Sequence, residues 1–172
     1  MYNVYSFFWG LIIVAKQPDH RIDELDALLL RELQQDARTG VLELSRRLDV
    51  ARGTVQARLD RMLSAGVIQG FRLDIKLEAL GYKVKAFVTV EVKEGQVDSV
   101  VEPLAEIDEV LEVHSVAAQG DLLCLVAARS NAHMMDVLES ILAVPDIART
   151  STAIVLKTQI ENRSSQLLRA DK

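Results

Sequence analysis

Hydrophobic residues follow two different spacings along the chain, and the change falls near Leu80. Before that point, apolar side chains recur every three or four residues, as in helices that bury one face. After residue 83, apolar and polar residues alternate, as in a strand with one buried face. The pattern predicts a helical N-terminal domain followed by a domain that is built on a sheet.

The first domain is predicted over residues 19–66 as a helix-turn-helix whose helices lie over 19–35, 41–48 and 52–63. Acidic residues open the first helix, where negative charge complements the helix dipole. Asp49 is expected in the tight turn between the second and third helices. The residues expected to face inward are Ile22, Leu25, Leu29, Leu33, Val41, Leu44, Leu48, Val55, Leu59 and Met62.

The second domain, residues 83–160, holds two passes of strand, helix and strand. The predicted segments are a strand over 83–92, a helix over 97–104, strands over 110–118 and 122–128, a helix from residue 131 and a strand over 148–159. In the second helix, Met135, Leu138 and Leu142 are expected to face inward. Two such passes make the βαββαβ order of a ferredoxin-like domain, so the chain is expected to belong to the α+β class.

Three further segments flank these domains. Residues 67–82 contain a short apolar run between two glycines, which predicts a winglet hairpin followed by a linker. Residues 161–172 form a polar C-terminal tail. Residues 1–18 hold five of the eight aromatic residues, but their apolar run of 12 residues falls short of the roughly 20 that span a membrane. We interpret them as an appended arm that packs on a partner subunit, or as the product of a misassigned start codon.

Charge is distributed unevenly between the two domains. The chain carries a net charge of -5, yet the stretch from Arg38 to Arg61 contains six arginines and three acids. Residues 77–172 hold nine basic residues against fifteen acids. Because charges act on a phosphate backbone over about 10 Å, the local excess matters more than the total. The first domain is therefore expected to bind double-stranded DNA, and the second to be an acidic body.

The third predicted helix carries the residues expected to read bases. Burial of its apolar stripe leaves Arg52, Gly53, Gln56 and Asp60 on the opposite face. A major groove admits one helix, in which Arg pairs with guanine and Gln with adenine. Arg52 and Gln56 are the predicted base readers, and Gly53 and Thr54 allow close approach.

Other arginines are predicted to contact phosphates, which positions the domain without reading sequence. These are Arg38, Arg46, Arg47, Arg58 and Arg61. The alternative for surface arginines is an ion pair inside the domain. Glu43 and Arg47 have i, i+4 spacing, and Arg58 is placed to hold an acid of the first helix.

A series of spaced residues is specific enough to indicate a family. The series is Asp23-x-x-Asp26, Leu29-Leu30-x-x-Leu33-Gln34-x-Asp36-x-Arg38, Glu43-Leu44, Arg58-x-x-x-Met62-x-x-x-Gly66-Val67-Ile68-x-Gly70-Phe71 and Leu80-Gly81. Over about residues 22–160 the chain resembles the leucine-responsive regulatory protein/AsnC (Lrp/AsnC, feast/famine) family of transcriptional regulators. The resemblance implies a winged helix-turn-helix joined to a RAM/ACT-like domain of ferredoxin-like fold.

The chain departs from the family pattern at three positions of the helix-turn-helix. Gly40 stands at a cap that usually holds Ser or Thr, Asp49 replaces a turn glycine, and Ala51 replaces a serine cap of the recognition helix. Alanine is a poor N-cap and costs about 1 kcal/mol. DNA affinity or helix order is expected to be lower for this reason.

The same resemblance implies self-association and ligand binding by the second domain. Family members form dimers through the sheet, assemble further into tetramers or octamers, and bind effectors such as amino acids between dimers. The loop Ala118, Gln119, Gly120 and Asp121 occupies the family's Gly-x-x-Asp effector position, with Ala118 in place of glycine. Asp121 would hold an α-amino group, or else simply cap the turn. Thr150 and Thr152 are also assigned to this site.

Other functions fit the residues less well. Some proteins that resemble this fold decarboxylate sirohaem-type tetrapyrroles, and His114 would be the acid, but an acidic body poor in Arg suits a polycarboxylate badly. An assembly protein without DNA affinity is the other alternative. An RNA-binding sheet needs stacking aromatics, and only Phe87 is available.

Features of enzymes and of secreted proteins are also missing from the sequence. The single cysteine, Cys124, excludes an intrachain disulfide and a cysteine zinc cluster. The sequence contains no phosphate loop, no nucleophile elbow and no metal-spaced His/Cys/Asp cluster. A cytoplasmic, sequence-specific transcriptional regulator without cofactor, metal, membrane span or catalytic residue is expected.

Overall fold

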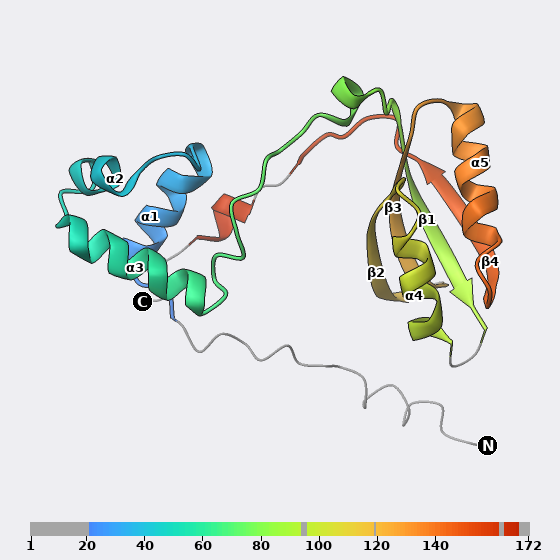
Figure 1. Ribbon diagram of the computed structural model, residues 1–172, viewed down its shortest axis with the longest axis horizontal. Helices are drawn as coiled ribbons and strands as arrows, with labels where there is room; N and C mark the ends of the chain where they lie inside the picture. Colours follow the sequence, from blue (N-terminus) through green and yellow to red (C-terminus); the bar gives the residue numbers. More distant parts are fainter. Residues whose placement is uncertain (1–20, 94–95, 119, 162–163, 169–172) are drawn as a thin grey trace, which may run out of the picture. The chain divides into compact units, whose positions relative to one another are not determined.

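The computed structural model in Figure 1 describes residues 21–93, 96–118, 120–161 and 164–168. The chain divides into two compact units, one from the described parts of residues 1–73 and 162–172, and one from residues 74–161. The arm predicted over 1–18 lies outside the described residues. None of the helices in the described ranges is long and apolar enough to cross a membrane.

The first unit contains three helices, α1 (Glu24–Gln35), α2 (Val41–Arg47) and α3 (Arg52–Ser64). A capping box starts α1, because Asp26 N donates to Asp23 Oδ1 at 3.0 Å and Asp23 N donates to Asp26 Oδ2 at 3.3 Å. Asp49 takes a left-handed conformation with φ 52° in the turn before α3. The helix α3 itself begins after Ala51 without a side-chain cap.

The core of this unit comes from the predicted inward faces of the three helices. The buried side chains are Leu29, Leu33, Leu44, Val55, Leu59 and Met62. Val67 and Ile68 pack against them from the segment after α3. The three helices and their inward faces are confirmed, except that α1 begins at Glu24 and not at residue 19, so Ile22 precedes the helix.

The predicted winglet hairpin is wrong for this structure, because the described residues 67–76 contain no strand. Two glycines with positive φ, Gly66 at 72° and Gly70 at 151°, turn the chain away from an extended path. Phe71 and Leu73 are exposed, so the core holds only the first residues of this segment, Val67 and Ile68, and not a second strand. An isolated two-stranded hairpin is marginally stable in water, and none of the described residues of the unit adds a third strand.

The second unit is a four-stranded antiparallel sheet in the order β2-β3-β1-β4. Its elements are the 3-10 turn η2 (Leu77–Leu80), β1 (Val84–Val92), α4 (Val97–Ala105), β2 (Val110–Ala118), β3 (Gly120–Ala128), α5 (Asn131–Leu142) and β4 (Ile147–Ile154). In Figure 1 both helices lie over one face of the sheet. This order and layering confirm the ferredoxin-like prediction and the α+β class.

The helix-covered face of the sheet holds the second core. Alternate residues of β1 and β3 enter it, namely Ala86, Val88, Val90, Leu122, Cys124 and Val126. From α5 it receives Met134, Val137 and Ile141, with Leu138 partly buried against them, so the predicted inward face is right for Leu138 and wrong for Met135 and Leu142. Met135 is 58% and Leu142 50% exposed. Two adjacent stripes of α5 are apolar, so the spacing of residues alone did not show which stripe faces inward. Packing of the helix on the sheet determines which one is buried.

Strand β4 ends at Ile154 and not near residue 159 as predicted. Its pairing with β1 runs out there, because Ala86 is the register partner of Ile154 and Val155 N donates to Lys85 O at 2.8 Å. A strand beyond that point would have no neighbour. The chain instead returns to the first unit, where the 3-10 turn η3 (Ser164–Leu167) lies on α1.

Candidate nucleic-acid interface and ligand site

The exposed face of α3 carries a stripe of polar residues one helical turn apart. Arg52, Gln56 and Asp60 are all exposed, and the apolar stripe of the same helix is buried behind them. Gln56 Nε2 donates to Asp60 Oδ1 at 2.8 Å. Beside Arg52, a side chain placed on Gly53 would meet no atom within 4 Å, so this position is open surface. Thr54 is exposed in the same first turn.

A buried carboxylate on α1 holds α3 in position. The side chain of Asp26 is fully buried, and its carboxylate accepts from Arg61 Nη2 at 2.9 Å and Arg58 Nη1 at 3.2 Å. Arg58 also pairs with Asp23, and this hydrogen bond holds the pKa of the Asp23 carboxyl below its ordinary value. Arg58 therefore makes the intramolecular pair that its position suggested, and Arg61 makes a second one that spacing did not reveal.

Arg47 joins α2 to α1. Its Nε donates to Glu43 Oε1 at 3.0 Å, as the i, i+4 spacing indicated, and its Nη1 donates to Glu32 Oε2 at 2.9 Å. The bonds to Glu32 and Glu43 raise the pKa of Arg47. Two carboxylates thus already pair with this guanidinium.

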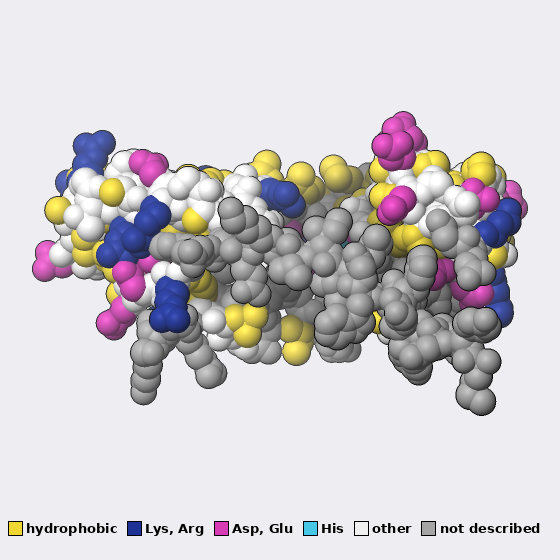
Figure 2. All heavy atoms as spheres, turned by 90° about the horizontal axis from the view of Figure 1, so that it is seen from below, with side chains coloured by type: hydrophobic (Ala, Val, Ile, Leu, Met, Phe, Trp, Pro, Cys, Tyr) yellow, Lys and Arg dark blue, Asp and Glu magenta, His cyan; other side chains and the backbone are white. Residues whose placement is uncertain are grey.

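Three predicted DNA contacts keep an outward-facing charge. Arg38 has a side chain that is 92% exposed, and among the described residues it pairs only with its neighbour Asp36, at 3.4 Å. Arg46 and Arg52 are exposed and form no ion pair with another of the described residues. Figure 2 shows Lys and Arg side chains exposed on this helical unit, with acids among them.

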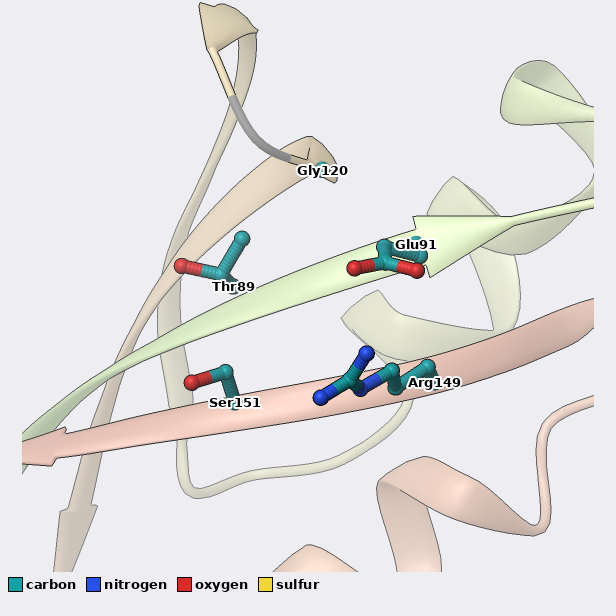
Figure 3. Close-up of a pocket in the computed structure, with 5 residues that line it drawn as sticks. All are labelled: Thr89, Glu91, Gly120, Arg149 and Ser151. Carbon is teal, nitrogen blue, oxygen red and sulfur yellow. The ribbon is translucent and has the colours of Figure 1, made fainter.

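The face of the sheet opposite the helices contains an open hollow of about 390 Å³. Figure 3 shows its lining residues, which are Thr89 and Glu91 on β1, Gly120 at the start of β3, and Arg149 and Ser151 on β4. Strand pairing places them in two rows, because Thr89 is the register partner of Ser151 and Glu91 that of Arg149. The hollow therefore presents an acid, a guanidinium and two hydroxyls to solvent.

The predicted effector loop borders this hollow through Gly120. Gly120 has φ 88°, and a Cβ there would lie 2.4 Å from Thr89 Cγ2, so the position requires glycine. Asp121 Oδ2 accepts from Val92 N at 2.8 Å, so its carboxylate binds the end of β1 and not the turn that it was alternatively expected to cap. Ala118 ends β2 as the register partner of Gly120, and Gln119 lies outside the described residues.

Thr150 and Thr152 lie on the other face of the sheet. Their register partners are Val90 and Val88, whose side chains belong to the helix-covered core. The hollow is lined instead by their neighbours Arg149 and Ser151, which the sequence pattern did not single out. Strand alternation was the signal, because assigning either face to β4 determines the other.

His114, the residue of the alternative catalytic reading, sits on β2 in an exposed setting. Its Nε2 lies 2.9 Å from Glu112 Oε2, and both side chains are more than half exposed. Within the described residues there is no group of three or more His, Cys, Asp or Glu side chains placed to hold a metal ion.

Comparison with known proteins shows to which class of protein this chain belongs. A model described as a winged helix-turn-helix DNA-binding domain matches residues 22–69, and one described as the Lrp/AsnC ligand binding domain matches residues 85–165. A helix-turn-helix joined to a ligand-binding sheet domain defines a DNA-binding transcriptional regulator. The chain belongs to the Lrp/AsnC family of these regulators.

Similar proteins span nearly the whole of this architecture. The HTH-type transcriptional regulator FL11 of Pyrococcus horikoshii is 32% identical over 81% of this chain and 93% of its own. The structure of E. coli AsnC has a TM-score of 0.80 at 31% identity and covers 85% of this chain and 99% of that one. A feast or famine regulatory protein from M. tuberculosis, solved with L-methionine, has a TM-score of 0.77 at 34% identity, with coverage of 83% and 97%.

Proposed function

We propose that this regulator binds specific double-stranded DNA sites through the exposed stripe of α3 and that a small zwitterionic effector, an amino acid, modulates this binding. The observation that carries the proposal is the position of Arg52 and Gln56 on the one face of α3 that the core leaves free. In this reading the chain acts by binding and not by catalysis, and it works in the cytoplasm.

The ion pairs of the helical unit separate the predicted DNA contacts into those that bind DNA and those that hold the helices together. Arg52 and Gln56 read bases, and Gly53 and Thr54 let the backbone of α3 approach the groove. Arg38 and Arg46 contact phosphates, because their charges face outward. The remaining phosphate candidates, Arg47, Arg58 and Arg61, act mainly by fixing α2 and α3 on α1, since carboxylates already satisfy them.

The effector is proposed to bind in the hollow of the sheet. Glu91 and Arg149 face the same space from adjacent strands. An α-ammonium group suits the carboxylate and an α-carboxylate suits the guanidinium, with charge-assisted hydrogen bonds to both. The M. tuberculosis relative was solved with L-methionine, which supports an amino acid as the ligand class. In this proposal the role of Asp121 is to hold the end of β1 beside the hollow.

Self-association is proposed through the same open face, so the hollow with its ligand would lie at the interface between two sheets. Phe87 is 43% exposed there, and Leu123 and Leu125 are half-buried beside it. A second sheet laid on this face would cover these apolar side chains and bring two copies of α3 to one DNA duplex. We propose a homodimer that assembles further to a tetramer or octamer, which mass measurement in solution tests directly.

The DNA assignment is tested with sites selected from random oligonucleotides by the full chain. Replacing Arg52 and Gln56 together by alanine should abolish the preference for the selected site and keep the binding to random DNA. Replacing Arg46 by alanine should weaken both and reduce the slope of log affinity against log salt by about 0.9. Glu24→Gln, an exposed change on α1, is the matched control. An unchanged preference in the double variant would overturn the assignment of the readers.

The ligand assignment needs a separate measurement. Calorimetry with each of the common L-amino acids should find binding that Glu91→Gln and Arg149→Gln each weaken. Glu78→Gln, an exposed acid outside the hollow, should bind as the natural chain does. Retained affinity in both hollow variants would place the effector elsewhere.

A further inference from the structure

A hydrogen bond on the surface of α3 involves one of the two proposed base readers. Gln56 Nε2 donates to Asp60 Oδ1 at 2.8 Å, and both side chains are exposed on the face that leads away from the core. The bond stabilises no buried contact of the helical unit. It links two residues one helical turn apart, at the position where α3 would meet a groove.

The carboxylate determines which way round the Gln56 amide lies. An ionised Asp can only accept hydrogen bonds, so the amide nitrogen of Gln56 must face Asp60 and the carbonyl Oε1 must face away. The reversed amide would bring two acceptor oxygens together. One N–H of Gln56 is then used, and its other N–H and its Oε1 stay free on one edge.

A free edge of one donor and one acceptor matches a single base. Adenine offers N7 as an acceptor and N6–H as a donor in the major groove, whereas guanine offers two acceptors at N7 and O6. A Gln56 amide that turns freely can present both N–H groups to guanine. With one N–H held by Asp60, that arrangement is lost.

We propose that Asp60 is a positioning residue for sequence recognition, which holds the Gln56 amide in the orientation that accepts adenine and rejects guanine. The inference rests on the proposed role of Gln56 as a base reader. Asp60 also brings a negative charge toward the phosphates, which weakens binding to any DNA. Its two effects therefore have opposite signs, since it lowers general affinity and raises selectivity.

The test compares full-length variants on two duplexes that differ only in adenine or guanine at the position that Gln56 reads. This position is the one where Gln56→Ala flattens the base preference in a selection experiment. Asp60→Ala should strengthen binding to random DNA and lower the adenine-to-guanine ratio. The drop should be about twofold if the bond is as weak as an exposed helix pair. It should reach about tenfold if the groove shields a charge-assisted bond from water.

Two controls separate positioning from a general charge effect. Asp60→Asn keeps the shape but has an amide that can turn, so its ratio should fall between those of the natural chain and Asp60→Ala. Glu24→Gln removes an acid from α1 and should leave the ratio unchanged. Because Asp60 is exposed, folding should be intact, and circular dichroism checks it.

Two results would overturn the proposal, and they are distinguishable. If Asp60→Ala keeps the ratio while Gln56→Ala removes it, Gln56 reads the base but Asp60 does not position it. If Gln56→Ala changes the preference at no position, the base-reading role itself is wrong, and the inference falls with it.

Discussion

Replacing Asp26 by alanine tests whether one buried carboxylate holds the recognition helix in place. Asp26 closes the capping box of α1 and pairs with two arginines of α3. Its side chain is fully buried, while those of Arg58 and Arg61 are 27% and 46% exposed. The substitution removes the acid and leaves both arginines in the structure.

The expected cost follows from this burial. Breaking a buried ion pair by removing one partner costs about 3 to 5 kcal/mol. Here the stranded guanidiniums can regain water, which favours the lower end, and loss of half the capping box adds roughly 0.5 to 1 kcal/mol. We expect a loss of about 3 to 4 kcal/mol in the free energy of unfolding of the helical unit. Small domains have about 5 kcal/mol in all, so DNA affinity should fall as well.

Hydrogen exchange followed by mass spectrometry measures this in the full chain, because peptides from α1 and α3 report on the helical unit separately from the sheet. Opening free energies of these peptides should drop by the stated amount, and those of β1 and β3 should not change. Glu24→Ala removes an exposed acid from the same helix and is the control. A loss below about 1 kcal/mol, or an equal loss in the control, would refute the role given to Asp26.

Three further predictions follow from the described contacts. Gly120→Ala forces a Cβ to within 2.4 Å of Thr89 Cγ2 at a positive φ, so thermal denaturation should show a sheet unit destabilised by at least about 1 kcal/mol; an unchanged midpoint would contradict this. The pKa of Asp23 is lowered from 3.8 by its bond to Arg58, so the stabilisation is present above that pH and lost as the pH falls below it. Acid titration of the helix signal should therefore be shallower in Arg58→Ala, and an identical acid limb would count against the pair. Burial raises the pKa of Cys124 to about 11, so a thiol reagent should label it at mildly alkaline pH only after urea unfolds the sheet, and fast labelling of the native chain would disprove its burial.

Periodicity was sufficient to predict much of the fold. The alternation along β1 determines which face is apolar, and Ala86, Val88 and Val90 are buried as that pattern required. The inward stripes of the first three helices followed in the same way. Two departures are local ambiguities. Helix α5 carries two apolar stripes, and the segment after α3 has the pattern of a hairpin, but only its first residues, Val67 and Ile68, pack on the core.

The site depended more on tertiary structure. Sequence spacing placed Arg52 and Gln56 on the exposed face of α3, because the position of the buried stripe determines the opposite face. It indicated that Arg58 could pair with an acid of α1, but it did not reveal the pair between Arg61 and Asp26, which are 35 positions apart. It also placed Thr150, and not Arg149, beside the effector loop.

The sequence by itself therefore determined the family resemblance, the class of each domain and the outward face of α3. The last two depend on the spacing of residues that are close along the chain. Only the tertiary structure decided which charges are already neutralised and which side chains share the hollow of the sheet. The physical reason is the separation along the sequence of the residues that interact. Burial patterns repeat locally along the chain, whereas an ion pair or a pocket is made by segments that meet only after folding.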